Sequence, residues 1–266
     1  MELELYKKHL IADEIIQIDD VTENMLTGKV QFLNKVKKKV VDMNGRLKDE
    51  EGFFPPANIH SLLKRSFDIM VSATALLLLS PVFLLVALAI RIESKGPTFY
   101  VSERAGKGYR IFKFYKFRTM FVGADKQIRD FSHLNQYRSD SVAEDPSFFK
   151  INDDPRTPRV GTFLRNTSLD ELPQLLNVLL GDMSLVGNRP LPLYEAAMLT
   201  TDQNAKRFLA PAGMTGLWQI SKRGKEEMSV EERISLDIDY ASKSNFMYDL
   251  WIMANTPSAL IQKSNV

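Results

Sequence analysis

The chain has 266 residues, 44% of them apolar and 26% charged, which is the composition of one large globular domain or of one domain with an arm. Cysteine is absent, which excludes disulfides, thiolate nucleophiles and cysteine-ligated metal or iron–sulfur sites. The three histidines, His9, His60 and His133, lie far apart, and their spacing argues against a histidine-rich zinc site. The net charge of +2 conceals an uneven distribution, because residues 69–90 carry no charged side chain.

The first 60 residues are polar and weakly patterned. Val30, Leu33 and Val40 lie near helical spacing among several lysines, which is compatible with an amphipathic helix on an anionic membrane surface or with a solvated helix. Residues 49–58, with a glycine and two prolines after an acidic start, have the composition of a linker. We therefore treat residues 1–60 as an N-terminal arm of unknown role.

The uncharged segment 69–90 has 22 residues, and about 20 apolar residues suffice to cross a bilayer core of about 30 Å as a helix. Ser80-Pro81 lies at its middle, where proline must kink or break a helix. Basic residues flank both ends, whereas the positive-inside rule expects one basic flank for a single span. These flanking residues are Lys64 and Arg65 before the segment, and Arg91 and Lys95 after it.

A re-entrant helix–break–helix hairpin accounts for both features. Each half, of about 11 residues, would rise roughly 16 Å and reach only the middle of the bilayer core, so both ends would face the cytoplasm. Backbone groups freed at the break would need local partners, and the Ser80 hydroxyl is a candidate. We expect residues 61–94 to form this membrane hairpin, with a kinked full span and a buried helix of a soluble domain as alternatives.

Residues 95–118 interleave seven basic side chains with aromatic ones and contain a single acid, Glu103. Tyr109–Phe117 has the composition of a strand, and the preceding AGKG predicts a tight turn. Positive charge beside a membrane suits lipid headgroups or a phosphorylated ligand. Interleaved cations and aromatic rings are also typical of single-strand nucleic-acid binders. The direct attachment to an apolar hairpin makes nucleic acid the less favoured partner.

Asp170 and Glu171 are the strongest local candidates for chemistry. They precede leucines on one helical face that ends at Gly181, and Ser168 and Glu171 also have the spacing of a simple capping box. Carboxylates at a helix start are favoured in their ionised form, and neighbours diverge by about 100°. One could therefore attack phosphorus while the other holds a divalent cation. Nearby candidates for binding phosphates are Arg156, Arg159, Arg165 and Arg189.

Two further segments, 124–137 and 230–257, are predicted to be helical, the second with a polar junction at residues 242–245. Together with the strand-like segment before them, they predict a mixed α/β fold that is mostly helical.

Taken together, these segments resemble the bacterial sugar transferases, monotopic polyprenyl-phosphate phosphoglycosyl transferases that start surface-glycan assembly. The resemblance runs from about Lys64 to Pro257 and includes KRSFDIMVSATALLLLSP, GPTFYVSERAGKGYRIFKFYKFRTM, DDPRTPRVGTFLRNTSLDELPQLLNVLLGDMSLVGNRP and PAGMTGLWQISKRG. It implies a re-entrant hairpin with Ser-Pro at the break and a small catalytic domain, residues 95–266, at the cytoplasmic face of the bacterial inner membrane.

The resemblance also implies an activity. Family members transfer a sugar 1-phosphate from a nucleotide diphosphate sugar, usually a UDP-sugar, to polyprenol phosphate and release UMP. Their nucleophile corresponds to Asp170, and the neighbouring acid, which is associated with magnesium (Mg²⁺), corresponds to Glu171. Lys116 of the KFRTM motif is expected near this dyad. The remaining phosphate- or nucleotide-binding candidates are Arg118 of the same motif, Arg165 of the basic cluster, Arg189 of the late PRP motif, and Asp237 of the LDxxY motif.

One residue departs from the family pattern, because the PRP motif reads Asn188-Arg189-Pro190 here. The loss of a proline frees the backbone before Arg189 and adds an amide donor, which leaves the placement of Arg189 open. Two other functions also stay open: a catalytically silent membrane scaffold, and a direct glycosyltransferase that would release UDP.

Overall fold

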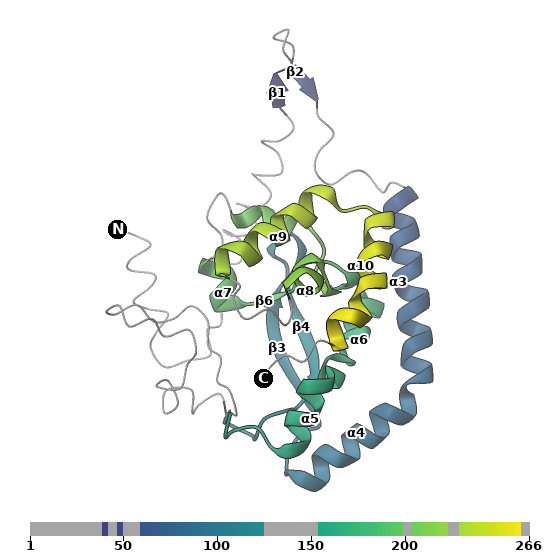
Figure 1. Cartoon of the computed structure of the whole chain (residues 1–266), viewed down its shortest axis with the longest axis vertical. Helices are drawn as coiled ribbons and strands as arrows, with labels where there is room; N and C mark the ends of the chain where they lie inside the picture. Colours follow the sequence, from purple (N-terminus) through teal and green to yellow (C-terminus); the bar gives the residue numbers. More distant parts are fainter. Residues whose placement is uncertain are drawn as a thin grey trace, which may run out of the picture.

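A computed structural model describes residues 39–41, 47–49, 59–124, 154–198, 204–222 and 229–261 (Figure 1). Its strands are β1 (Lys39–Val41), β2 (Leu47–Asp49), β3 (Phe99–Ala105), β4 (Ile111–Phe117), β5 (Ser184–Val186), β6 (Leu191–Pro192) and β7 (Gly213–Thr215). Its α-helices are α3 (Ile59–Leu78), α4 (Ser80–Glu93), α5 (Arg159–Thr167), α6 (Gln174–Leu180), α7 (Leu193–Met198), α8 (Leu217–Lys222), α9 (Val230–Lys243) and α10 (Phe246–Ile261). Short 3₁₀ segments are η1 (Lys107–Tyr109), η4 (Leu169–Glu171) and η5 (Asn204–Leu209).

The strands form small sheets rather than one large one. β3 lies between β4 and β6 in an antiparallel sheet, and β5 pairs with β7 in parallel. The β3–β4 pairing runs from Phe99 opposite Phe117 to Ala105 opposite Ile111, and η1 lies in the turn between them. The predicted strand and turn are therefore confirmed, and so is a mixed α/β fold in which most of the structure is helical.

The apolar segment folds as two helices that meet at Ser80-Pro81. In α3 the carbonyl of Leu77 would normally accept from the N–H four residues later, but that residue is Pro81, which has none. The Ser80 hydroxyl donates to the Leu77 carbonyl instead, at 2.8 Å. The predicted break and the predicted role of Ser80 are both confirmed. In the part of the chain that the structure describes, no single helix is long and apolar enough to span a membrane. The pair Ser61–Leu78 and Ser80–Glu93, which is bent by 59°, has the length and composition to do so together.

The start of α3 is fixed to the rest of the protein by polar contacts. Lys64 donates to Asp249 at 2.5 Å and to the carbonyl of Val186 at 3.0 Å. Arg65 donates to the last carbonyls of α6, those of Val178 and Leu179. Two of the basic residues that flank the apolar segment therefore bind the protein itself.

Around the bend and along α4, the helix pair exposes large apolar side chains. In Figure 1, α3 and α4 run along one outer side of the molecule. Large side chains that are more than half exposed there are Leu77, Leu78, Leu84, Leu85, Leu88 and Ile92.

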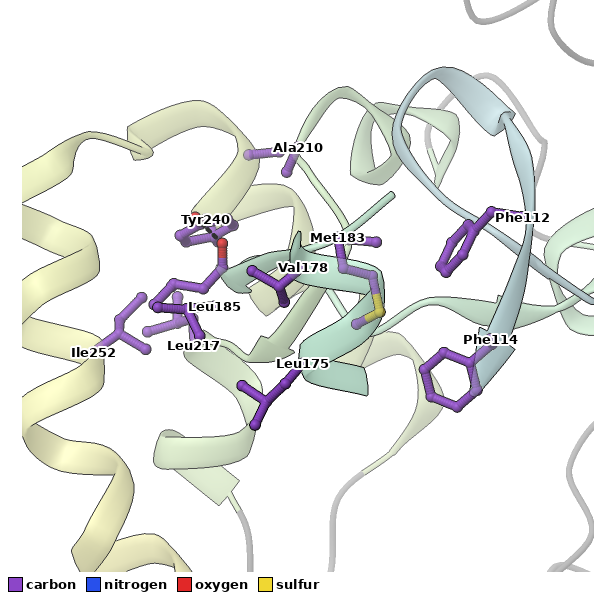
Figure 2. Close-up of a cluster of buried hydrophobic side chains, with 13 residues drawn as sticks. Phe112, Phe114, Leu175, Val178, Met183, Leu185, Ala210, Leu217, Tyr240 and Ile252 are labelled. Atoms are coloured by element: carbon purple, nitrogen blue, oxygen red, sulfur yellow. Dashed lines mark hydrogen bonds between the residues drawn. The ribbon is translucent and has the colours of Figure 1, made fainter. Parts of the chain in front are cut away.

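A hydrophobic core joins β4, α6, β5, α8, α9 and α10 behind the β3–β4 sheet. Figure 2 shows Phe112 and Phe114 of β4 on one side of Met183, with Tyr240 and Ile252 of the last two helices on the other. The buried Asn177 of α6 fastens this core to β4, since it accepts from the N–H of Tyr115 and donates to the carbonyl of Lys113. This fixes the strand that carries Lys116.

The remaining sequence predictions have mixed outcomes. The helices α9 and α10 confirm the helical segment 230–257 and its junction. Val40 lies in β1, paired with Lys48, so the helix expected around residues 30–40 is wrong at that end, because strand pairing prevails over the helical spacing. The rest of that helix, the linker 49–58 beyond residue 49, and residues 125–137 lie outside the described residues. The boundaries at residues 60 and 94 stay predictions.

Candidate active site

The acidic dyad lies in a short 3₁₀ turn between two helices. α5 ends at Ser168, whose backbone is left-handed with φ of 57°, and η4 carries Asp170 and Glu171 before α6 begins. The expected capping box is wrong, because Ser168 makes no side-chain cap in this conformation. Gly181, also left-handed with φ of 96°, ends α6 as predicted.

Lys116 lies beside both carboxylates. Its Nζ is 3.4 Å from Oδ2 of Asp170 and 3.5 Å from Oε1 of Glu171. Strand β4 brings the lysine to the turn, so the KFRTM motif and the dyad meet although more than 50 residues separate them. The expectation that Lys116 lies near the dyad is confirmed. Both distances are longer than a normal charge-assisted hydrogen bond, so the ammonium is shared loosely between two oxygens.

A second cation, Arg189, also pairs with Glu171. Its Nη2 lies 3.2 Å from Oε1 of Glu171, and the carboxylate raises the pKa of this arginine. Its side chain is 34% exposed, so a ligand can reach it from solvent. Glu171 thus faces two cations, Lys116 and Arg189, both of which are side chains of the kind that binds phosphate groups.

Arg165 belongs to the same neighbourhood. Its Nε donates to the hydroxyl of Thr119 at 3.0 Å. Helix α5, which carries Arg165, contacts η4, which carries the dyad. Burial lowers the pKa of this arginine, and the charge of Asp170 opposes that shift. The structure therefore gathers Lys116, Arg165 and Arg189 around the two acids.

The environment of Asp170 differs from the expectation of a carboxylate stabilised by a helix dipole. Its side chain is almost fully buried, and burial raises its pKa above the ordinary value, while Lys116 counteracts the shift and Glu171 adds to it. A carboxylate with little water around it is poorly solvated, so its charge depends on the neighbouring cations. This is an environment typical of a reactive group.

Arg118, Arg156 and Asp237 have their described polar contacts elsewhere. The guanidinium of Arg118 donates to the carbonyls of Ser94 and Lys95 at the end of α4. Arg156 pairs with Asp154 and donates to the carbonyl of Ala124, and Asp237 pairs with Arg207. These contacts give the three residues structural positions, and their binding of phosphate or nucleotide stays a prediction.

Sequence reasoning missed two residues that support the site, Asn177 and Arg207. Asn177 lies inside one of the segments that resemble the family, but no spacing marked it, and Arg207 lies between two of those segments. Each acts through backbone groups far away in the sequence. The departure at Asn188 and the candidate Asp237 pointed to the part of the structure that contains Arg207.

The dyad suits a magnesium ion that arrives with substrate phosphates. In the described ranges there is no group of three or more acidic, histidine or cysteine side chains that could hold a metal ion. Mg²⁺, however, is commonly held by one or two carboxylates, several waters and the phosphates of a substrate. Asp170 and Glu171 supply two adjacent carboxylates beside cations that attract phosphate, so the residues fit such a shared site.

Comparison with known proteins gives consistent results. The family model described as bacterial sugar transferase matches residues 59–263. The exopolysaccharide production protein ExoY of Rhizobium meliloti is 38% identical over 213 residues, which are 80% of this chain and 90% of that protein. The undecaprenyl-phosphate galactose phosphotransferase of Salmonella typhimurium is 36% identical over 203 residues, 76% of this chain and 41% of that protein. The UDP-glucose:undecaprenyl-phosphate glucose-1-phosphate transferase of Escherichia coli is 33% identical over 261 residues, 92% of this chain and 49% of that protein.

Proposed function

We propose a specific reaction for this chain, which belongs to the bacterial sugar transferase family and is a transferase. It transfers a sugar 1-phosphate from a UDP-sugar to polyprenol phosphate, giving a polyprenyl diphosphate sugar and UMP, and so begins the assembly of an exopolysaccharide. The proposal is carried by one observation: two adjacent carboxylates, one of them buried, share Lys116, and the second also pairs with Arg189. The named activities of the relatives support the choice of donor and acceptor.

In the first step, a carboxylate oxygen of Asp170 attacks the sugar-bearing phosphorus of the donor. A new P–O bond to Asp170 forms, the bond from that phosphorus to the bridging oxygen breaks, and UMP leaves with the bridging oxygen. The transition state of phosphoryl transfer carries charge on its equatorial oxygens, which fixed cations stabilise. Lys116 and Arg189 can supply these cations.

In the second step, an oxygen of polyprenol phosphate attacks the phosphorus of the phospho-aspartyl intermediate. The bond between that phosphorus and the Asp170 oxygen breaks, and its electron pair returns to the carboxylate. Lys116 can hold the released carboxylate, since it already lies 3.4 Å from Oδ2. Glu171 would hold Mg²⁺, which when bound neutralises phosphate charge.

The same proposal places the helix pair in the inner membrane. α3 and α4 would enter from the cytoplasmic face as a re-entrant hairpin, with the exposed leucines around the bend in the acyl region. The bend at Ser80-Pro81 and the apolar outer face support this arrangement. It would bring the dyad to the headgroup level, where the phosphate of the lipid acceptor lies.

The test is nucleotide release from a panel of UDP-sugars with polyprenol phosphate and magnesium, for the wild type and Asp170→Asn. We expect UMP from one sugar, and its loss in the variant. Asp239→Asn, which changes an exposed helical carboxylate paired with Lys243, is the matched control and keeps activity. UDP in place of UMP would indicate a direct glycosyltransferase. A donor that binds without any nucleotide release would indicate a silent scaffold.

A further inference from the structure

The backbone that carries Arg189 is clamped immediately before this residue. Asn188 lies between β5 and β6, and its N–H donates to the carbonyl of Pro211 while its carbonyl accepts from Gly213. The two backbones run so close that a Cβ on Gly213 would lie 2.1 Å from the nitrogen of Gly187. These hydrogen bonds and the close approach of the two backbones therefore fix the main-chain path immediately before Arg189.

The side chain of Asn188 ties this path to two other elements. It is 5% exposed, and its Nδ2 donates to the carbonyl of Arg207 at 2.8 Å and to the carbonyl of Asp237 at 2.9 Å. One amide group thus joins the segment before Arg189 to η5 and to α9. A proline at this position could make neither of these bonds nor the backbone bond to Pro211.

A buried ion pair, Arg207–Asp237, also contacts the backbone of Arg189. Nε of Arg207 donates to Oδ2 of Asp237 at 3.1 Å, and its Nη2 binds the same oxygen. That Nη2 also donates to the carbonyl of Arg189 at 3.2 Å. Arg207 and Asp237 are 3% and 1% exposed, so neither can meet a substrate without a rearrangement, and their effect must pass through the residue they hold.

We infer that Asn188, Arg207 and Asp237 form a positioning unit that fixes where the guanidinium of Arg189 meets Glu171 and the donor phosphate. Asn188 fixes the backbone immediately before Arg189, and Arg207, which is paired with Asp237, donates to the carbonyl of Arg189. The three residues act only through Arg189 and do not touch the reacting atoms. The inference deepens the proposed function and rests on it for the role of Arg189, but the clamping of the backbone stands apart from it.

A double-mutant cycle tests whether the effect passes through Arg189. Asn188→Ala and Asp237→Asn are each made in the wild type and in Arg189→Ala, and kcat/KM for the UDP-sugar is measured. We expect each substitution to lower kcat/KM by about tenfold in the wild type and by less than about twofold in Arg189→Ala, since residues of one network are not additive. Equal losses in both backgrounds would overturn the inference.

A control separates positioning from general loss of stability. Asp249→Asn also removes a buried carboxylate that is paired with a cation, in this case Lys64 at the start of α3. Any loss it causes should be the same in both backgrounds. If Asp237→Asn does not fold, Asn188→Ser, which removes the amide but introduces no charge, takes its place in the cycle.

Hydrogen–deuterium exchange gives a second readout that does not depend on the reaction. Peptides covering residues 188–192 should exchange at least about tenfold faster in Asn188→Ala, because the local opening of a clamped segment becomes easier. Asn177→Ala is the matched control, since this buried amide also bridges two backbone groups but holds β4. It should accelerate exchange in residues 111–117 and leave 188–192 unchanged. Unchanged exchange at 188–192 in Asn188→Ala would overturn the inference even if Asp170-dependent UMP release is found. Absence of that release would count against the proposed function alone.

Discussion

Two lysine–aspartate pairs in this protein have the same chemistry and different geometries. Lys116 lies 3.4 Å from Asp170, whereas Lys64 lies 2.5 Å from Asp249. Both carboxylates are buried, and burial raises the pKa of both. Asp249 also accepts from the hydroxyl of Tyr240 at 2.7 Å, while Lys116 is shared with Glu171.

Under the proposed function, this difference separates a reactive carboxylate, Asp170, from a structural one, Asp249. A carboxylate with several close donors is satisfied, and it gains little from a new ligand. Among the described residues, Asp170 has one distant side-chain donor, Lys116, and it is poorly solvated, so an approaching phosphorus or cation can improve its environment. Asp249 fixes the start of α3, and with it the whole helix pair, to α9 and α10. Substitutions in the two pairs test this difference.

Asp170→Asn should have the largest effect on activity. We expect UMP release to fall by at least about 10³-fold, because an amide cannot form the covalent intermediate. The thermal unfolding temperature in detergent should not fall, since the change removes a poorly solvated charge. Radiolabelled donor should also leave no phosphate on the variant. Retention of that label by Asp170→Asn would assign the nucleophile to another residue.

Lys116→Met should lower kcat by about 10²-fold, which is typical of the loss of one cation at a developing negative charge. Because the contacts of Lys116 are long, its loss should cost less unfolding free energy than the loss of a partner from a close buried pair, which is about 3 kcal/mol. Steady-state rates and denaturant unfolding of the same preparation check both values. A large loss of stability with unchanged kcat would reverse the roles that we assign to the two pairs.

Lys64→Met should do the opposite of Lys116→Met. Removal of the cation leaves Asp249 buried without its charged partner, which typically costs about 3 kcal/mol in unfolding free energy. The kcat of the folded fraction should stay within about twofold of the wild type, because Lys64 touches no reacting group. Denaturant unfolding followed by tryptophan fluorescence, with activity corrected for the folded fraction, measures both. The double variant Lys64→Met with Asp249→Asn should recover part of the stability.

A smaller effect concerns pH. Because burial holds the pKa of Asp249 above its ordinary value, with Lys64 opposing the shift, the folded state binds this proton more tightly than the unfolded state. The contribution of Asp249 to stability therefore falls as pH rises from the unfolded pKa toward the folded one, by at most about 1.4 kcal/mol per pH unit. Asp249→Asn should remove this component from the slope of unfolding free energy against pH. A slope unchanged between wild type and variant would contradict the direction of the shift.

Local chemistry made some features readable from the sequence. The break at Pro81 depends on one missing N–H, and the end of α6 at Gly181 depends on one glycine that tolerates a left-handed backbone. Asp170 and Glu171 are neighbours because they are consecutive residues of the chain. By contrast, the capping-box interpretation was wrong, because Ser168 has a left-handed backbone that places Asp170 and Glu171 in a separate turn. The spacing of residues does not fix the backbone conformation between two helices.

The helix break, the fold class, the acidic dyad and, through the motifs, the family could all be predicted from the order of the residues. Which charged side chains meet depends on the folded arrangement of the elements. Lys116 reaches the dyad because β4 lies against η4, whereas Arg118, two residues later, turns to the end of α4 and Asp237 is buried against Arg207. The physical reason is that a charged side chain selects its partner by distance in space and by loss of water, and neither quantity is written in the spacing of residues along the chain.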